Sequence, residues 1–391
     1  MVNDSKSIYT LPFALLCMSS LLFSASFNMI IPELPNHLSK MGGGEHKGLI
    51  IALFTLTAGI SRPFSGKLTD RWGRVPVMAV GSVVCFVCGF LYPVISSVAL
   101  FFLLRLVHGF STGFKPTATS AYVADIIPQN RWGEALGMHG LCFSIGGAIG
   151  PAVGSFIAQN YGINPMFYSS SLFALLSIVI VINMRETLQN KERFSTSMLK
   201  IRRTEILEWR VLPAAVVTLL SYSGYGVILT LIPDWSEYLG IGNKGLFFTA
   251  YTLSSILIRF ISGKVADRYG RIHVMIVGLF IVALAVLLIG LGDSIEGLIA
   301  GAIIYGIGTG ILSPAVNAWT IDLSLPQHRG KAMATMYIAL EVGIGGGALL
   351  AGYVYSDNVT RIPHIFIVNS FIILIAFFYV IFWNQKNKSR T

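Results

Sequence analysis

The nine residues GKLTDRWGR, at positions 66–74, return almost unchanged as GKVADRYGR at positions 263–271. Both copies lie between long apolar stretches of a 391-residue chain that is 54% hydrophobic and only 12% charged. Soluble domains carry about 25% charged residues, so a composition this apolar indicates a membrane protein. A charged loop that occurs twice in such a chain predicts the internal duplication of a membrane-spanning unit.

Apolar segments long enough to cross a bilayer occur twelve times. A hydrocarbon core about 30 Å thick needs roughly 20 apolar residues per helix. Windows of that length centre near residues 20, 57, 85, 109, 147, 174, 223, 255, 282, 307, 342 and 373. The predicted fold is an all-α membrane protein with twelve transmembrane helices in two pseudo-symmetric six-helix bundles, residues 1–184 and 211–391, joined by a polar cytoplasmic linker at 185–210.

The two halves match beyond the repeated loop. Arg62 aligns with Arg259, and further along the chain Asp125 aligns with Asp322, each pair being 197 positions apart like the loops themselves. Two similar bundles related by an axis along the membrane normal can rock against each other around a central site. The duplication therefore predicts transport by alternating access.

The formal charge of +10 reflects membrane topology. With the N-terminus placed inside, 20 of the 28 Lys and Arg residues fall on the inner side, as the positive-inside rule requires. We therefore expect a multi-pass protein of a bacterial cytoplasmic membrane, with both termini in the cytoplasm and no nucleic-acid partner. Cys85 and Cys88 form a CxxC without a second ligand pair, so neither a metal site nor a disulfide is expected.

The repeated loop resembles motif A of the major facilitator superfamily of secondary transporters. Two glycines allow a tight turn between helices, and the resemblance implies that Asp70 latches a cytoplasmic gate to the eleventh helix, which starts near Gly330. The matched positions of the gate are Gly66, Asp70, Arg71, Gly73 and Arg74, and in the copy Gly263, Asp267, Arg268, Gly270 and Arg271.

The sequence GGAIGPAVG, residues 146–154, resembles motif C of the same family. Gly146, Gly150 and Gly154 repeat every four residues, so they share one helix face and permit close helix packing, and Pro151 bends the helix. In the family this motif marks exporters that work as antiporters, particularly drug/proton antiporters. The resemblance therefore implies export.

Two ionisable residues lie well inside predicted helices. Arg105, in a stretch that resembles the family's motif B, is interpreted as a cavity-facing group that binds an anion or tunes a proton site; the alternative is an arginine fixed in a polar network. Glu341 lies near the middle of the eleventh helix, where burial disfavours a charged carboxylate. We expect it to carry protons or bind substrate, or else to be a permanently protonated or Arg-paired carboxyl that braces its helix.

Other ionisable and aromatic positions complete the predicted site. Glu33 and Asp234 end their helices at the outer face, as gating or coupling groups or as ordinary interfacial residues. Asp125 and Asp322 could form gate pairs with Arg131 and Arg329. Lys115 could extend to the inner surface or bind an acidic substrate. The cavity candidates are Phe27, Asn28, His108, Thr112, Lys115, Tyr222, Tyr225, Tyr305, Asn317, Trp319 and Tyr337.

The sequence predicts a monomeric, proton-driven exporter of small amphipathic organic molecules, with the proton as coupling ion and no cofactor. No nucleophile elbow, zinc helix motif or phosphate-binding loop indicates an enzyme. An importer or facilitator of a sugar, metabolite or metal-chelating compound is the alternative within transporters. A membrane receptor or scaffold is the alternative outside them.

Overall fold

The structure, a computed structural model, describes residues 10–128, 131–201, 207–325 and 329–388, and these residues contain helices without a β-strand. The predicted all-α membrane fold is confirmed. The first half contains α1 (Leu11–Ile30), α2 (Leu34–Lys40), α3 (Gly48–Arg71), α4 (Arg74–Leu91), α5 (Val98–Ile126), α6 (Trp132–Tyr161) and α7 (Ile163–Ile182). The second half contains α8 (Leu212–Tyr238), α9 (Leu246–Tyr269), α10 (Arg271–Leu291), α11 (Ile295–Leu323), α12 (Arg329–Tyr355) and α13 (Ile362–Lys388).

The helices have the length and composition of membrane spans. Among the described residues, eleven helical segments are long and apolar enough to cross a bilayer. α9 supplies a shorter apolar stretch, Leu246–Arg259, at the position predicted for the eighth crossing. The chain is therefore a multi-pass integral membrane protein.

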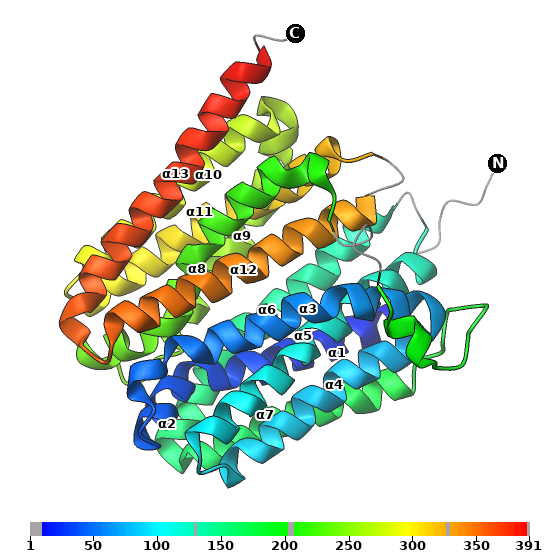
Figure 1. The fold of residues 1–391 in the computed structure, drawn as a ribbon, viewed down its shortest axis with the longest axis horizontal. Coiled ribbons are helices and arrows are strands. Elements are labelled where there is room, and N and C mark those ends of the chain that lie inside the picture. Colours follow the sequence, from blue (N-terminus) through cyan, green and yellow to red (C-terminus); the bar gives the residue numbers. More distant parts are fainter. Residues whose placement is uncertain (1–9, 129–130, 202–206, 326–328, 389–391) are drawn as a thin grey trace.

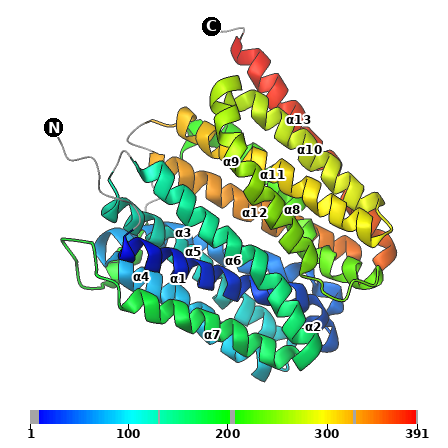
Figure 2. The same cartoon turned by 180° about the vertical axis from the view of Figure 1, so that it is seen from behind.

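The two halves form separate groups of helices that meet along two seams. Figure 1 shows the blue-to-green N-terminal half beside the yellow-green-to-red C-terminal half. In one seam α3 packs against α12, and in the other α6 packs against α9, which Figure 2 shows from behind. Because α9 repeats α3 and α12 repeats α6 in the duplicated sequence, the two seams are pseudo-symmetric counterparts.

Glycines bring helices together inside each half. A Cβ atom at Gly146, Gly150 or Gly154 of α6 would overlap backbone oxygens of α1. Gly343 and Gly347 of α12 approach the backbone of α8 in the same way. Small residues at a helix interface allow such close backbone approach. The motif C glycines therefore lie on one face and hold α6 against α1.

The turns after α3 and α9 depend on the repeated motif. Gly73 has a φ of 136° and Gly270 a φ of 86°, and each directly precedes the next helix. L-residues with a Cβ rarely adopt positive φ, whereas glycine does so without strain. We call the end of the bundle that carries these two turns the motif end, and the end where α3 and α9 begin the closed end.

Seam packing is tight at the closed end. A Cβ atom at Gly48 of α3 would overlap the carbonyl oxygen of Ala348 on α12. Likewise, a Cβ atom at Gly245, which directly precedes α9, would overlap the backbone of Pro151 on α6. Backbone therefore meets backbone across both seams at this end.

The same helices have open space beside them nearer the motif end. A Cβ atom at Gly66 of α3, or at Gly137 or Gly140 of α6, would meet nothing within 4 Å. The described glycines near the closed end thus contact the opposite half, whereas these three glycines nearer the motif end do not.

The segment between the halves is attached to both of them. Residues Thr196–Leu199 form a short 3₁₀ turn that packs on α3, and Lys67 donates a hydrogen bond to the carbonyl oxygen of Lys200 (2.6 Å). At the other end of the segment, the Glu208 amide donates to the hydroxyl of Thr335 on α12 (2.8 Å). These two attachments fix where the segment leaves each half.

Candidate functional site

An ion pair joins the two halves in the interior of the α3–α12 seam. Arg62 Nη2 on α3 donates to Glu341 Oε1 on α12 at 2.7 Å, with the two side chains 17% and 9% exposed. The guanidinium also lies 5.0 Å from the ring centroid of Tyr337, one helical turn before Glu341 on the same face. α12 thus presents an aromatic face and a carboxylate to one arginine of the opposite half.

The Arg62–Glu341 contact explains how a carboxylate can lie in the middle of the membrane. A charged group inside the hydrocarbon region costs several kcal/mol unless it finds a partner or water. A charge-assisted hydrogen bond to a guanidinium provides that compensation. The sequence alternatives for Glu341 included pairing with an arginine, and the structure shows such a pair. Proton carrying by Glu341 remains a prediction.

Arg105, the arginine that the sequence favoured, lies elsewhere. Its side chain is 1% exposed and packed inside the first half, with Nε donating to the Ile50 carbonyl oxygen (2.9 Å) and Nη1 to the Tyr92 hydroxyl (3.1 Å). The guanidinium lies 4.5 Å from the Phe54 ring centroid. The prediction that Arg105 faces a cavity is therefore wrong, because a backbone carbonyl, a phenol and a ring satisfy it within its own half.

Lys115 and His108 are also buried inside the first half. Lys115 Nζ donates to the Ser19 hydroxyl (2.7 Å) and to the Ser177 hydroxyl, and His108 Nδ1 lies 3.3 Å from the Tyr92 hydroxyl. These groups do not face the seams. Their prediction as cavity residues is contradicted, and Lys115 neither reaches the inner surface nor presents a charge to substrate.

The remaining cavity candidates differ in burial and in their aromatic neighbours. Phe27 stacks on Phe54 with ring centroids 6.3 Å apart, and Tyr225 lies 5.8 Å from Tyr251. Trp319 is buried against Trp383 in the second half. Tyr222, Asn28 and Asn317 are half-buried, whereas Thr112 and Tyr305 are buried.

A buried ionic cluster closes the α3–α12 seam at the closed end. Lys47 Nζ lies 2.5 Å from Asp234 Oδ2 and 2.7 Å from Asp357 Oδ1. The Tyr355 hydroxyl donates to the same Asp234 oxygen at 2.7 Å. The sequence singled out Asp234 but counted Lys47 only as an outer-loop charge. A lysine at the same offset before both copies of the repeated helix was the signal that could have identified it.

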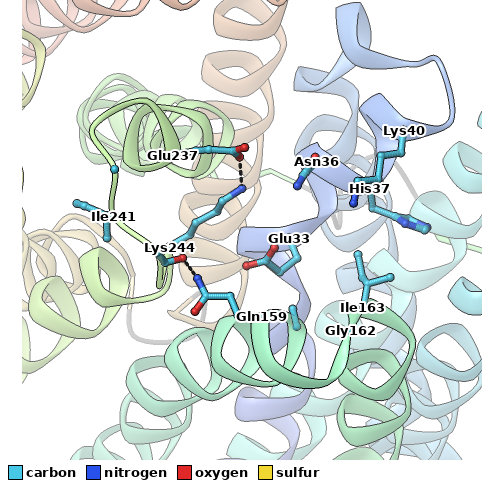
Figure 3. A pocket seen from close by; sticks show the side chains of 13 residues that line it. Glu33, Asn36, His37, Lys40, Gln159, Gly162, Ile163, Glu237, Ile241 and Lys244 are labelled. Atoms are coloured by element: carbon cyan, nitrogen blue, oxygen red, sulfur yellow. Dashed lines mark hydrogen bonds and ion pairs between the residues drawn. The ribbon is translucent and has the colours of Figure 1, made fainter.

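The corresponding place beside the α6–α9 seam is a pocket of about 500 Å³. Figure 3 shows Glu33 in its wall and an ion pair between Lys244 and Glu237. The Glu33 carboxylate accepts a hydrogen bond from the Ser155 hydroxyl (2.7 Å). The pocket is lined by Glu33, Asn36, His37, Lys40, Ala158, Gln159, Gly162, Ile163, Glu237, Gly240, Ile241, Gly242 and Lys244.

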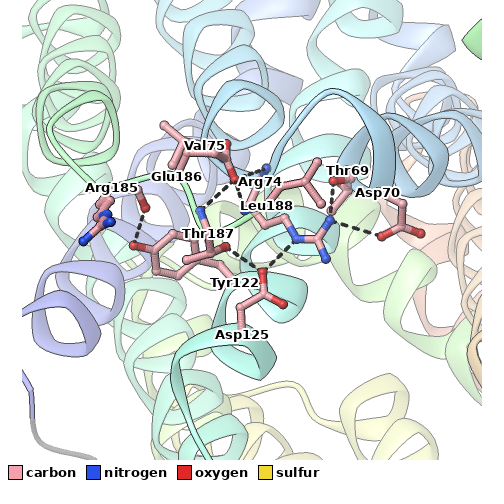
Figure 4. A network of polar contacts seen from close by, with 10 residues as sticks. All are labelled: Thr69, Asp70, Arg74, Val75, Tyr122, Asp125, Arg185, Glu186, Thr187 and Leu188. Atoms are coloured by element: carbon pink, nitrogen blue, oxygen red, sulfur yellow. Dashed lines mark hydrogen bonds and ion pairs between the residues drawn. The ribbon is translucent and has the colours of Figure 1, made fainter. Parts of the chain in front are cut away.

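The motif A arginine organises the motif end of the first half. Figure 4 shows Arg74 donating to the Thr69 carbonyl oxygen (2.6 Å) and to Asp125 Oδ2 (2.9 Å), with Asp70 Oδ1 at 3.4 Å. The Thr187 hydroxyl donates to Asp125 as well (2.6 Å). Asp70 is 74% exposed and its ion pair lies within its own half. Its latching role remains a prediction.

The second copy repeats this pairing. Arg271 Nη1 lies 2.6 Å from Asp322 Oδ2 and also donates to the carbonyl oxygen of Ala318. Arg131, directly before α6, pairs with Glu134 in the first turn of α6 instead of with Asp125. The predicted pairing of Asp125 with Arg131 is therefore wrong, because Arg74 occupies that carboxylate. Four residues of the predicted gate lie outside the part of the chain whose side-chain surroundings the structure describes: Gly263, Asp267, Arg268 and Arg329.

Two repeated halves of long apolar helices, joined by an ion pair between α3 and α12 and packed backbone to backbone at one end, define the class of an integral membrane transporter. A model of the Major Facilitator Superfamily matches the chain twice, over residues 16–213 and 214–391. The chain therefore belongs to the Major Facilitator Superfamily.

Curated relatives and solved structures match most of the chain. The multi-drug resistance efflux pump PmrA of Streptococcus pneumoniae is 28% identical over 348 residues, which cover 85% of this chain and 87% of PmrA. Multidrug resistance protein 2 of Bacillus subtilis is 23% identical, covering 98% of this chain and 97% of its own length. A crystal structure of a POT family transporter in complex with a thioalcohol-conjugated peptide has a TM-score of 0.80 at 13% identity, with 96% of both chains covered. At that identity the likeness concerns the fold alone.

Proposed function

We propose that the protein is a proton-coupled exporter of small amphipathic organic molecules that works by alternating access. The relative named as the multi-drug resistance efflux pump PmrA supports export as the direction of transport. The observation that carries the proposal is the Arg62–Glu341 ion pair, because it places the mid-membrane carboxylate directly across the seam between the halves.

The positive-inside rule assigns the two ends of the bundle to the two sides of the membrane. Arg71 and Arg74 lie at the motif end, and Arg271 does so in the second half. Clustered arginines favour the cytoplasmic side. Under this assignment the closed end faces the outside, and the motif end faces the cytoplasm, where an exporter collects its substrate.

The ion pair gives a physical route for coupling to protons. In the inward-facing state, Arg62 compensates the charge of Glu341. Opening of the closed end separates α3 from α12 and removes this partner, and a carboxylate without a counter-ion inside the membrane takes up a proton. The return movement brings Arg62 back and releases the proton to the cytoplasm, so protons move inward while substrate moves outward.

The test compares wild type with Glu341→Gln in a bacterium stripped of its own efflux pumps. Accumulation of neutral, cationic and anionic amphipaths is measured with and without a proton uncoupler. We expect wild type to lower accumulation, the uncoupler to abolish this effect, and Glu341→Gln to behave like the empty vector. Glu134→Gln is the matched control, since Glu134 pairs with Arg131 directly before its own helix. Full uncoupler-sensitive export by Glu341→Gln would refute the assignment.

A further inference from the structure

The two seams repeat each other contact by contact near the closed end. Residues that meet across the α3–α12 seam have counterparts, 197 positions away, that meet across the α6–α9 seam. The packing of one seam therefore predicts the packing of the other. The matched contacts are Gly48 with Ala348 and Gly245 with Pro151, followed by Ala52 with Gly345 and Thr249 with Ala148.

The two seams differ in charge at the next matched contact, where the α3–α12 seam has the Arg62–Glu341 ion pair. The counterpart of Arg62 is Arg259, and the counterpart of Glu341 is Ser144. Arg259 Nη1 on α9 lies 3.5 Å from Ser144 Oγ on α6, so the two positions meet across their seam as Arg62 and Glu341 do. At this contact the α6–α9 seam has a guanidinium beside a hydroxyl, where the α3–α12 seam has a guanidinium beside a carboxylate.

This arrangement leaves a positive charge inside the membrane layer. Arg259 is thirteen residues from the start of α9, about 20 Å along the helix axis at 1.5 Å per residue, within a hydrocarbon core about 30 Å thick. Arg259 is exposed, whereas Arg62 is 17% exposed. Together with Glu341, the two arginines give this level of the interface a formal charge of +1. A cation at such depth favours the approach of an anion and opposes that of a second cation.

Aromatic side chains lie on the helix that carries Arg259 and beside that helix. Tyr251 lies on α9 eight residues before Arg259, about two helical turns along the same helix. The Tyr251 ring centroid lies 5.8 Å from that of Tyr225 and 5.3 Å from that of Tyr305. Aromatic packing beside one fixed cation suits a molecule that has an apolar body and a single anionic group.

We propose that Arg259 binds the anionic group of the transported molecule, and that the substrates are aromatic or apolar organic anions. The substrate then supplies at the α6–α9 seam the negative charge that Glu341 supplies at the α3–α12 seam. A guanidinium suits this task because its planar fork pairs with both oxygens of a carboxylate or sulfonate. The inference rests on the proposed transport function and names its substrate class.

The binding test uses three radiolabelled probes of similar shape: naphthaleneacetate, its neutral amide naphthaleneacetamide, and the cation naphthylethylamine. Equilibrium binding is measured on the purified full chain in lipid nanodiscs. We expect wild type to bind the acetate about 10- to 100-fold more tightly than the amide, as one charge-assisted pair provides. Arg259→Gln removes this preference and Arg259→Lys keeps part of it. Ser144→Glu weakens acetate binding because its own carboxylate competes for Arg259.

The control is Arg361→Gln, which removes one exposed positive charge at the closed end and leaves the preference unchanged. Equal affinity for acetate and amide in wild type, no binding of the acetate at millimolar concentration, or an unchanged preference in Arg259→Gln would overturn the inference. Arg259→Lys and Ser144→Glu test the same point if Arg259→Gln fails to fold.

Proteoliposome transport of the same probes separates this inference from the proposed function. An Arg259-dependent preference for the acetate without any effect of a proton gradient upholds the anion site and refutes proton coupling. Proton-driven transport of naphthylethylamine that is unchanged in Arg259→Gln upholds the exporter and overturns the anion site.

Discussion

The α3–α12 and α6–α9 seams are built from duplicated sequence, yet they differ in charge. The first has an ion pair between Lys47 and Asp234 at the closed end, and the second has a pocket at the corresponding place. Further in, Glu341 faces an arginine across the first seam, whereas Ser144 faces one across the second. Gly48 and Gly245 occupy matched positions, and so do Arg62 and Arg259, but Glu341 of the first seam is matched by Ser144 in the second.

This difference teaches that packing and ionic chemistry can diverge independently after duplication. Small residues must be retained on both sides because a Cβ atom would push the backbones apart. A carboxylate is free to change as long as each charge finds a partner or solvent. One seam therefore has an arginine paired with a carboxylate, whereas the other has an arginine beside a serine hydroxyl.

The largest effect is expected from the contacts that the seams share. Gly48→Ala and Gly245→Ala each place a Cβ atom into backbone of the opposite half, so neither variant can close and both lose transport. Spin labels at the closed end, measured by electron paramagnetic resonance, should show the halves apart. Gly137→Ala is the control, since a Cβ there meets nothing within 4 Å. Normal transport by either closed-end variant would contradict the structure.

The two repeated lysines should differ strongly. Lys47→Met leaves Asp234 buried without its cation, a change that costs about 3–5 kcal/mol when a buried pair is broken. Lys244→Met removes a partner from Glu237, which is 59% exposed, and should cost less than about 1 kcal/mol. Thermal unfolding of the purified variants measures both. Equal losses of stability in the two variants would show that Lys47 and Lys244 contribute equally to holding the closed end together.

An exchange of the acid between the seams sharpens the comparison further. Glu341→Ser leaves Arg62 without its carboxylate and should lower stability by about 1–3 kcal/mol. Adding Ser144→Glu to this variant moves the acid opposite Arg259, and we expect most of the stability to return. Unfolding of the single and double variants is compared directly. No recovery in the double variant would show that the seams are not equivalent at this level.

The smallest effect is expected at the motif end. Arg74 is 13% exposed and holds both Thr69 and Asp125, so Arg74→Gln should cost about 1–2 kcal/mol. Its counterpart Arg271 is 33% exposed and pairs with a carboxylate that is 50% exposed. Arg271→Gln should therefore cost less than about 1 kcal/mol. A larger loss for Arg271→Gln in thermal unfolding would reverse this ranking.

The fold was predictable from the sequence because its determinants are local or repeated. Twelve apolar windows follow from bilayer thickness, and the copy of GKLTDRWGR at 263–271 reveals the duplication without any knowledge of contacts. The motif C glycines were equally readable, since a four-residue period fixes them to one helix face. Gly146 and Gly150 do face α1.

The site was less predictable because its pairs depend on the register between helices. Glu341 was identified from its position in an apolar helix, but its partner Arg62 is 279 positions away. Arg105 was chosen instead on the rule that a charge in the membrane faces a cavity. That rule overlooks backbone carbonyls such as that of Ile50, which accepts from Arg105 inside a single bundle.

The attachments of the segment between the halves set a limit on movement. Lys200 is fixed to α3 through Lys67, and Glu208 is fixed to α12 through Thr335. Eight peptide units separate these two anchor residues, and a fully extended chain of that length reaches about 28 Å. The covalent chain therefore acts as a tether of fixed length: as long as both attachments persist, the two anchor points can move apart no further than this, whatever substrate enters between the halves.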